Sequence, residues 1–172
     1  MPSVIIWALA LVVMVLESVL LDLFSAPGWA LQTPIAVTIY LGLDRNFSSG
    51  GLILVALLLP VEWLVAGVYG VYSLALAVLF LVLRLLRPNM QPVWGVARAV
   101  VAAVMVPLHA VVMLGVLFMS GAASHGEVTS VIGVQVWTSI PLVVAITLVM
   151  GRGFARLEKM MDSRKAGGEL EF

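Results

Sequence analysis

The 172 residues of this chain are 63% hydrophobic and only 10% charged, with a mean hydropathy of +1.17. This composition excludes an ordinary soluble domain, which is about half apolar and about a quarter charged. Nine basic and nine acidic residues leave no net charge, so no general attraction for nucleic acid is expected. The absence of cysteine excludes disulfides and thiolate metal sites. A spanning helix takes about 20 residues, which leaves room for one membrane domain and no soluble catalytic domain.

Six apolar segments, each expected to form a helix, follow one another along the chain: residues 4–24, 29–43, 52–66, 71–86, 93–119 and 131–150. The first lacks a basic n-region and an Ala-x-Ala cleavage pattern, so it predicts a retained helix and not a removed signal peptide. The second is short for a spanning helix and contains Pro34. Gly67-Val68-Tyr69-Gly70 predicts the turn between the third and fourth segments, and Pro88 and Pro92 predict a loop after the fourth.

The distribution of basic residues predicts the orientation of these segments. If the chain starts in the cytoplasm and crosses six times, all nine Lys and Arg lie on the inner side or in the inner half of a helix. The inner connections are then 44–50, 87–93 and the tail from Gly151, and the outer ones are 25–28, 67–70 and 120–129. A re-entrant second segment would break this alternation. The predicted fold is an all-α transmembrane six-helix bundle with both termini in the cytoplasm. It has a membrane domain at 1–150 and a cytoplasmic, amphipathic and disordered tail at 151–172.

Polar residues inside the apolar segments require an explanation, because a charge at membrane depth costs about 2.5–3.5 kcal/mol on insertion scales. Counted from the predicted helix ends at about 1.5 Å per residue, several of them reach a similar depth in the outer half of the bilayer. We predict that they form one polar layer, comprising Glu17, Gln32, Glu62, His109 and Gln135. Below this layer the same segments are almost purely aliphatic.

This polar layer has three interpretations. The polar groups pair with one another and hold the helices together, or they bind a ligand or a partner helix, or they are protonated near the outer interface and have no further role. For His109 a metal site is not expected, because no second histidine lies at metal-binding spacing.

The sequence contains no motif for catalysis, metal binding or phosphate binding, so neither an enzyme activity nor a cofactor is predicted. After residue 150 the chain becomes basic. Arg152, Arg156 and Lys159 surround apolar residues at helical spacing, which is typical of a segment that lies on an anionic membrane surface. A solvated tail that only follows the positive-inside rule is the alternative. Residues 167–172 are expected to be disordered.

The segment from residue 30 to residue 90 resembles MreD, the family of rod shape-determining membrane proteins. The features that carry the resemblance are a short helix started by Pro34, a polar loop with Gly50 and Gly51, an apolar helix ending in Glu62, the sequence Gly67-x-x-Gly70-x-Tyr72-Ser73-Leu74, and a basic helix end with Arg84 and Arg87. The remainder of the chain resembles the family in hydropathy, and its length is also similar.

This resemblance implies a fold and a function. The fold would be similar to the six-helix substrate-binding subunits of energy-coupling-factor vitamin transporters. The function would be that of a non-enzymatic, multi-pass scaffold in the bacterial inner membrane, within the machinery for cell elongation and peptidoglycan synthesis. Its direct partner would be the single-span protein MreC, and its indirect partners would be MreB, RodA and a penicillin-binding transpeptidase.

A different function remains open. The chain is also compatible with a small-molecule-binding membrane subunit of a vitamin-type transporter, in which the polar layer would line the ligand pocket. Such a pocket needs ordered outer loops, whereas the predicted connections at 25–28 and 67–70 are very short. We therefore favour the scaffold. An intramembrane enzyme ranks third, because no catalytic residues are evident.

Overall fold

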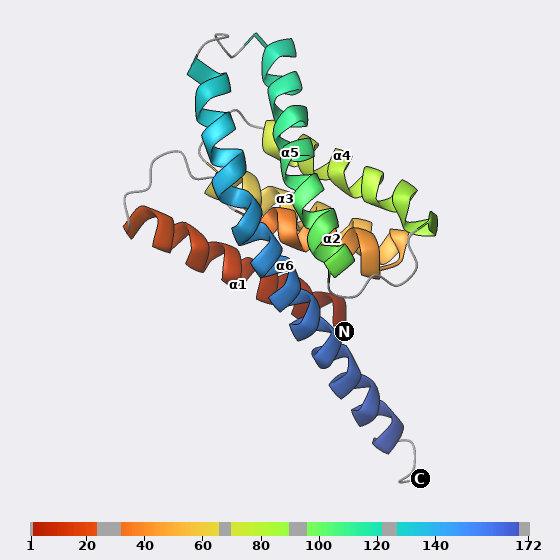
Figure 1. Cartoon of the computed structure of the whole chain (residues 1–172). Helices are drawn as coiled ribbons and strands as arrows, with labels where there is room; N and C mark the ends of the chain where they lie inside the picture. Colours follow the sequence, from red (N-terminus) through yellow and green to blue (C-terminus); the bar gives the residue numbers. More distant parts are fainter. Residues whose placement is uncertain (1, 24–31, 66–69, 90–95, 122–126, 169–172) are drawn as a thin grey trace.

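The computed structural model describes residues 2–23, 32–65, 70–89, 96–121 and 127–168, and these ranges contain helices and no strand. Six α-helices and one 3-10 turn follow in chain order (Figure 1): α1 Pro2–Leu23, α2 Thr33–Asp44, α3 Phe47–Leu64, α4 Val71–Leu86, η1 Arg87–Asn89, α5 Val96–Met119 and α6 Glu127–Gly168. The prediction of an all-helical chain with six helices is confirmed. Prolines inside α3, α5 and α6 do not end these helices, as is common in membrane helices.

Two classes of helix length are present. Among the described residues, four helices are long and apolar enough to cross a membrane: α1, α3, α5 and the 136–154 part of α6. The helices α2 and α4 are apolar but have only 12 and 16 residues, which correspond to about 18 and about 24 Å. A hydrocarbon core is about 30 Å thick. The chain is therefore a multi-pass membrane protein, and α2 and α4 are too short to cross the hydrocarbon core from one side to the other.

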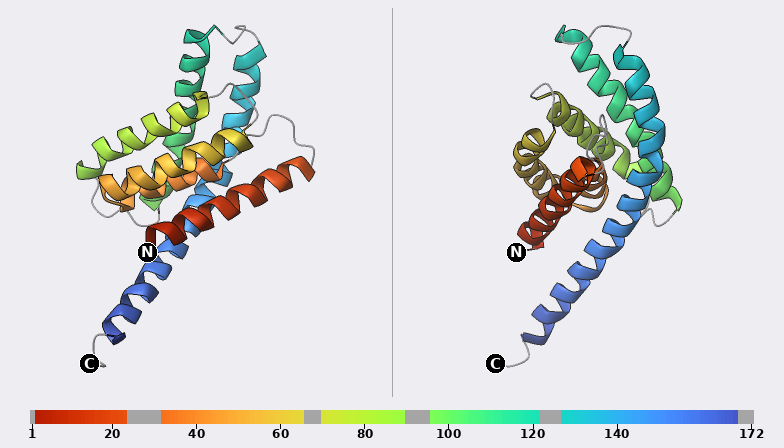
Figure 2. Two further views of the ribbon diagram at one scale, coloured as in Figure 1. Left: turned by 180° about the vertical axis from the view of Figure 1, so that it is seen from behind. Right: turned by 90° about the vertical axis from the view of Figure 1, so that its left-hand side faces the viewer.

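The helices form three hairpins in space. The hairpins α1–α2 and α3–α4 lie together, with α1 against α3 and α2 against α4. The third hairpin, α5–α6, crosses this group at a steep angle, with α5 on α4 and α6 on α2 (Figures 1 and 2). The sequence did not predict these crossing angles, because hydropathy predicts segments and not the angles at which they pack.

The shortest helix, α2, lies at the centre of the molecule. All its residues from Thr33 to Gly42 are buried, and α1, α3, α4 and α6 surround it. Gly42 permits the close approach to α4, because a Cβ atom at this position would lie 2.8 Å from the Cβ of Leu83. Small residues commonly allow such close helix contacts in membranes. The burial of α2 on all sides explains why it is apolar around its whole circumference.

The expected polar loop at 44–50 is mostly helical, which corrects the sequence interpretation. Only Arg45 and Asn46 connect α2 to α3, and α3 begins at Phe47. Phe47 packs against Phe80 with ring centroids 6.0 Å apart. A Cβ at Gly50 would lie 3.0 Å from the carbonyl oxygen of Leu41. This glycine therefore serves close packing between α2 and α3, and not a loop conformation.

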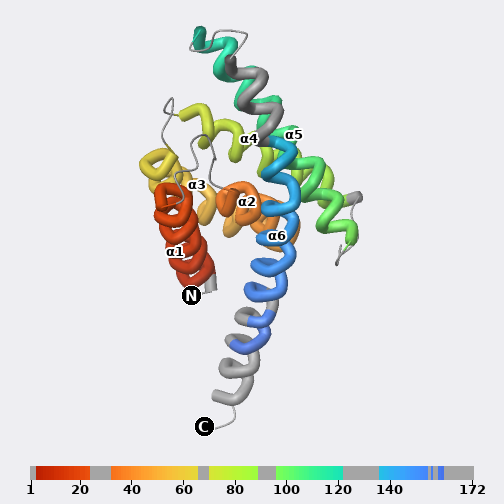
Figure 3. The backbone as a smooth tube through the Cα atoms, turned by 60° about the vertical axis from the view of Figure 1, so that its left-hand side comes forward, coloured from red at the N-terminus to blue at the C-terminus, as the bar shows by residue number. Residues whose placement is uncertain are grey.

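The last helix continues far beyond its expected end at residue 150. Helix α6 runs unbroken to Gly168 and projects away from the other helices (Figures 1 and 3). Its packed part includes Phe154, which is buried and contacts the Tyr40 ring at a centroid distance of 4.7 Å. Arg152, Arg156 and Lys159 are exposed. Residues 167 and 168, which were expected to be disordered, belong to α6, because the helix continues without a break; residues 169–172, the remainder of that segment, lie outside the described residues.

The predicted orientation can be tested by cysteine labelling, because the chain contains no native cysteine. We expect single cysteines at positions 48, 89 and 163 to be protected from a membrane-impermeant thiol reagent in intact cells, and a cysteine at position 124 to react. The reason is that all basic residues then lie on the cytoplasmic side. Permeabilised cells provide the control, in which all four cysteines should react. Reaction of Asn89→Cys in intact cells would reverse the orientation.

Candidate functional site

The carboxylate of Glu17 caps the start of α2. Helix α2 receives no side-chain cap from its own N-cap residue, Gln32. Instead Glu17, on α1, accepts hydrogen bonds from two backbone amides: the Gln32 N–H at 2.7 Å through Oε1 and the Thr33 N–H at 2.9 Å through Oε2. Gln32 and Thr33 are both buried. One carboxylate on α1 therefore satisfies two donors that the first turn of α2 leaves without intrahelical partners.

The carboxylate of Glu62 does the same for α4. Gly70, the N-cap residue of α4, is left-handed with φ of +86°, and it provides no side-chain cap. Glu62, on α3, accepts the Gly70 N–H at 2.9 Å and the Ser73 N–H at 2.8 Å. A left-handed conformation at this position favours glycine. The Gly70 turn and the Glu62 carboxylate together define where α4 begins.

These two interactions, which we call the carboxylate caps, have one physical cause. The first four N–H groups of a helix lack intrahelical partners, and an unsatisfied amide in lipid costs several kcal/mol. The ends of the short helices α2 and α4 therefore need acceptors inside the protein. A carboxylate also interacts favourably with the positive end of the helix dipole. The caps explain why Glu17 and Glu62 lie within otherwise apolar helices.

His109 and Tyr72 form a buried aromatic pair between α5 and α4. The two rings meet edge to face with centroids 4.8 Å apart, and both residues are almost fully buried. Among the described residues, His109 Nε2 and Thr33 Oγ1 are buried without a hydrogen-bond partner. No group of three metal-ligating side chains occurs in the part of the chain that the structure describes.

The residues of the predicted polar layer therefore have different neighbours. Gln32 adjoins the Glu17 cap, His109 packs on Tyr72, and Glu62 caps α4 separately. The side chain of Gln135 lies outside the described residues. The polar groups were expected to pair with one another, whereas the partners of both carboxylates include backbone amides. Sequence alone could not reveal this, because the start of each short helix depends on its packing.

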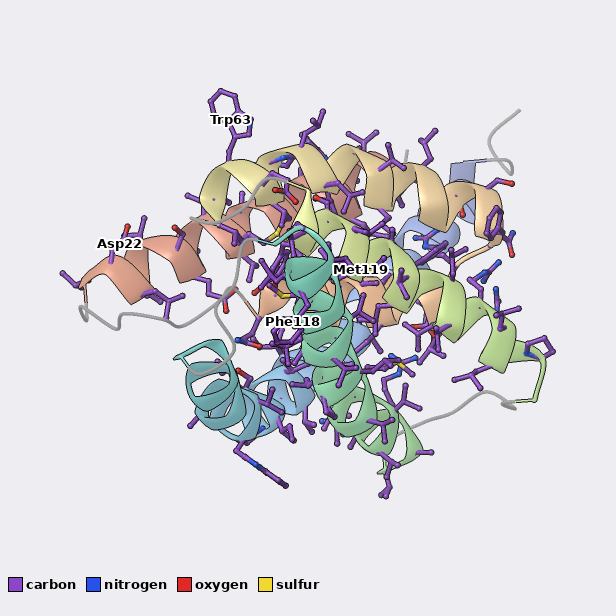
Figure 4. The ribbon with its side chains drawn as sticks, turned by 90° about the horizontal axis from the view of Figure 1, so that it is seen from above. Asp22, Trp63, Phe118 and Met119 are labelled. Atoms are coloured by element: carbon purple, nitrogen blue, oxygen red, sulfur yellow. The ribbon has the colours of Figure 1, made fainter. Side chains whose placement is uncertain are left out.

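Two other residues mark the same end of the hairpins. Trp63, next to Glu62, is 87% exposed and points away from the helices, and Asp22 is exposed near the end of α1 (Figure 4). Tryptophan is enriched at membrane–water interfaces. Both positions fit the boundary between lipid and water near the carboxylate caps.

An ion pair joins α5 to α2 at the opposite end, and α6 packs against it. Arg98, on α5, is buried, and its Nη2 donates to both carboxylate oxygens of Asp44, on α2, at 2.6 and 2.8 Å. Gly151 on α6 closes the site, since an added Cβ there would overlap Arg98 Nη1. Both charged groups belong to the predicted inner side, but their pairing was not predicted. Their opposite charges were a signal, yet a separation of 54 residues leaves many other pairings open.

Two further arginines cap the end of α2. Arg84 Nη1 donates to the carbonyl oxygens of Arg45 at 2.6 Å and Gly42 at 3.3 Å, and Arg87 Nη1 donates to the Arg45 oxygen at 2.6 Å. Cations at a helix C-terminus satisfy its unpaired carbonyls and complement its dipole. The central helix α2 is thus held by a carboxylate at its start and by arginines at its end, all supplied by other helices.

The acidic groups of this arrangement are engaged in contacts that hold helices together. The two membrane carboxylates are occupied by backbone amides, and Asp44 is occupied by Arg98. No nucleophile beside a general base is evident among the described residues, and the hydroxyl of Ser73 donates to the Leu58 carbonyl at 3.5 Å. Comparison with protein-family models, curated proteins and solved structures gives no match for this chain.

Proposed function

We propose that this chain is a non-enzymatic scaffold of the bacterial cell-elongation machinery, located in the cytoplasmic membrane, and that it binds an MreC-type single-span protein through helix contacts in the bilayer. Contacts with MreB, RodA and a penicillin-binding transpeptidase are then indirect. The family resemblance of residues 30–90 is the source of this assignment. The observation that carries the scaffold role is that the carboxylates at membrane depth cap helices, which leaves them unsuited to catalysis or ion transport.

The exposed apolar faces of the helices also support a scaffold. On α3, the side chains of Leu52, Val55 and Leu59 are at least 65% exposed and lie on one face at helical spacing. On α5, Val100 and Val104 are more than half exposed. In a bilayer such faces contact lipid, and helix partners bind them by van der Waals packing. A protein with several faces of this kind can hold more than one membrane partner.

Photo-crosslinking from these faces tests the proposal. A photo-reactive amino acid at Leu59 or Val104 is expected to capture a single-span membrane protein in cells, at near-stoichiometric yield for at least one of the two positions. The matched control is Leu57, which is 3% exposed on the same helix as Leu59 and should capture no partner. Recovery of a bound metabolite, with no protein partner from either exposed face, would contradict the scaffold.

One observation favours the second candidate, a small-molecule-binding subunit of a vitamin-type transporter. His109 Nε2 and Thr33 Oγ1 are buried polar atoms without partners among the described residues, and such groups usually have a reason. A ligand group that reached these atoms would satisfy them. Under this alternative, His109→Ala would abolish retention of a metabolite by the purified chain, whereas the scaffold predicts that partner capture from Leu59 or Val104 survives the change.

A further inference from the structure

A pocket lies beside the inner end of α4, away from the carboxylate caps. Its volume is about 720 Å³, and it is lined by two arginines and four apolar residues: Phe47, Leu81, Arg84, Leu85, Arg87 and Pro88. We call it the arginine pocket. Phe47 is the first residue of α3, and the others belong to the end of α4 and to η1. In the predicted orientation this end faces the cytoplasmic leaflet.

The two arginines of the pocket converge without a counter-charge. Both donate from Nη1 to the same carbonyl oxygen, that of Arg45, each at 2.6 Å. Two guanidinium groups on one oxygen repel each other. Within the described ranges, neither Arg84 nor Arg87 is paired with a carboxylate, and neither donates from a second nitrogen. The remaining N–H donors of the two planar groups therefore suit a ligand with several anionic oxygens, such as a phosphate.

The apolar residues of the pocket distinguish between sources of that phosphate. The side chains of Phe47, Leu81 and Leu85 are 58%, 51% and 77% exposed. Arg84 also lies over the rings of Phe47 and Phe80, at 5.8 and 6.0 Å, which holds its charge at the edge of the apolar surface. A soluble phosphate compound has no apolar part that would contact these three side chains. A phospholipid does, because its acyl chains continue from its phosphate into the apolar layer.

We propose that the arginine pocket binds one anionic phospholipid of the inner leaflet, with its phosphate between Arg84 and Arg87 and an acyl chain along Leu81, Leu85 and Phe47. Basic pockets between membrane helices on the cytoplasmic side are suited to such headgroups. A lipid with net negative charge is preferred to a zwitterionic one, because it brings no ammonium group to two unneutralised cations. The lipid would also relieve the repulsion between the arginines that cap α2, and so would stabilise the central helix.

Native mass spectrometry of the full chain, purified in a neutral detergent, tests this proposal. On titration with phosphatidylglycerol and with phosphatidylcholine, we expect one phosphatidylglycerol molecule to be retained at lower concentration than phosphatidylcholine. Arg87→Gln should weaken this retention about fivefold, the loss expected for about 1 kcal/mol per arginine near the surface. The matched control, Arg164→Gln, removes the same charge from the end part of α6 and should leave retention unchanged.

A second variant keeps the test valid if Arg87→Gln does not fold. Leu85→Asn changes a highly exposed side chain of the apolar wall, and we expect it to reduce phosphatidylglycerol retention severalfold. Inorganic phosphate at millimolar concentration should not compete with the lipid. The proposal is overturned if both lipids are retained equally, if Arg164→Gln weakens retention as much as Arg87→Gln, or if Leu85→Asn has no effect. Displacement by inorganic phosphate would instead assign the pocket to a soluble anion.

Discussion

Replacing Glu17 by leucine is expected to lower the stability of the folded chain more than any other single change near the carboxylate caps. The substitution leaves the Gln32 and Thr33 amides without their acceptor, and both residues are at most 2% exposed. A buried unsatisfied group costs about 1–3 kcal/mol, so two amides imply a loss of about 2–4 kcal/mol after partial relaxation. In detergent the melting temperature should fall by at least about 5 °C.

Three comparisons separate the cap from a general effect of charge. Glu17→Gln should be intermediate, because an amide oxygen can still accept one N–H, whereas the amide nitrogen cannot accept the other. Asp22→Asn, at an exposed position on the same helix, should leave the melting temperature unchanged. Hydrogen exchange should increase at the first turn of α2 in Glu17→Leu and not in Asp22→Asn. Equal melting temperatures for Glu17→Leu and the unmodified chain would refute the cap.

The corresponding change at the other cap should have a smaller effect. Glu62 accepts the Gly70 and Ser73 amides, but Gly70 is exposed and Ser73 is only partly buried. Water can replace part of the lost interaction at such a site. The stability of Glu62→Leu should therefore lie between that of Glu17→Leu and that of the unmodified chain. This ranking follows from the difference in burial, since each carboxylate accepts two backbone amides.

The second large effect is expected at Gly151, where alanine should destabilise the chain although alanine is the better helix former. A Cβ at this position overlaps Arg98 Nη1, and Arg98 is buried while it donates to Asp44. The guanidinium must therefore move and weaken the ion pair. Overpacking of this kind costs about 1–3 kcal/mol. Thermal denaturation in detergent measures the loss.

Gly153 provides the matched control on the same helix. A Cβ there meets nothing within 4 Å, so Gly153→Ala should be neutral or stabilising by up to about 1 kcal/mol from helix propensity. A double-mutant cycle with Asp44→Asn identifies the mechanism. Once the carboxylate is neutral, Gly151→Ala should cost less, with a coupling of about 1 kcal/mol. Strict additivity would mean that Gly151 contributes by packing alone and that Arg98 is not displaced from Asp44.

The two ends of α2 suggest how the central helix remains in place. Its start is held by a carboxylate from α1, and its end is held by guanidinium groups from α4. These charges have the signs that a helix dipole requires, negative at the start and positive at the end. A 12-residue helix that is apolar on every side has no polar face of its own to fix its depth. The capping residues on the neighbouring helices fix the depth of α2 instead.

Hydropathy determined the class of this protein and the existence of its helices. Apolar runs long enough to leave water must fold into helices in lipid, because every backbone group then finds a partner within its own segment. For this reason the sequence predicted six helices, and the pair of glycines at positions 67 and 70 predicted the turn that ends at Gly70. It also identified Glu17 and Glu62 as residues that need a partner, because a charge in lipid is costly wherever the helices pack.

Only the tertiary structure decided what those charges do. The acceptors of the α2 amides, the Arg98–Asp44 pair and the convergence of two arginines on the Arg45 carbonyl all join residues at least 15 positions apart in the chain. Such contacts depend on crossing angles and on where a short helix begins, and side-chain packing sets both. Gly50 illustrates the difference: by composition it belongs to a loop, but in the fold it brings α3 against the Leu41 carbonyl. The local sequence shows that a polar group in an apolar segment needs a partner. Which residue becomes that partner depends on how another helix packs against the segment.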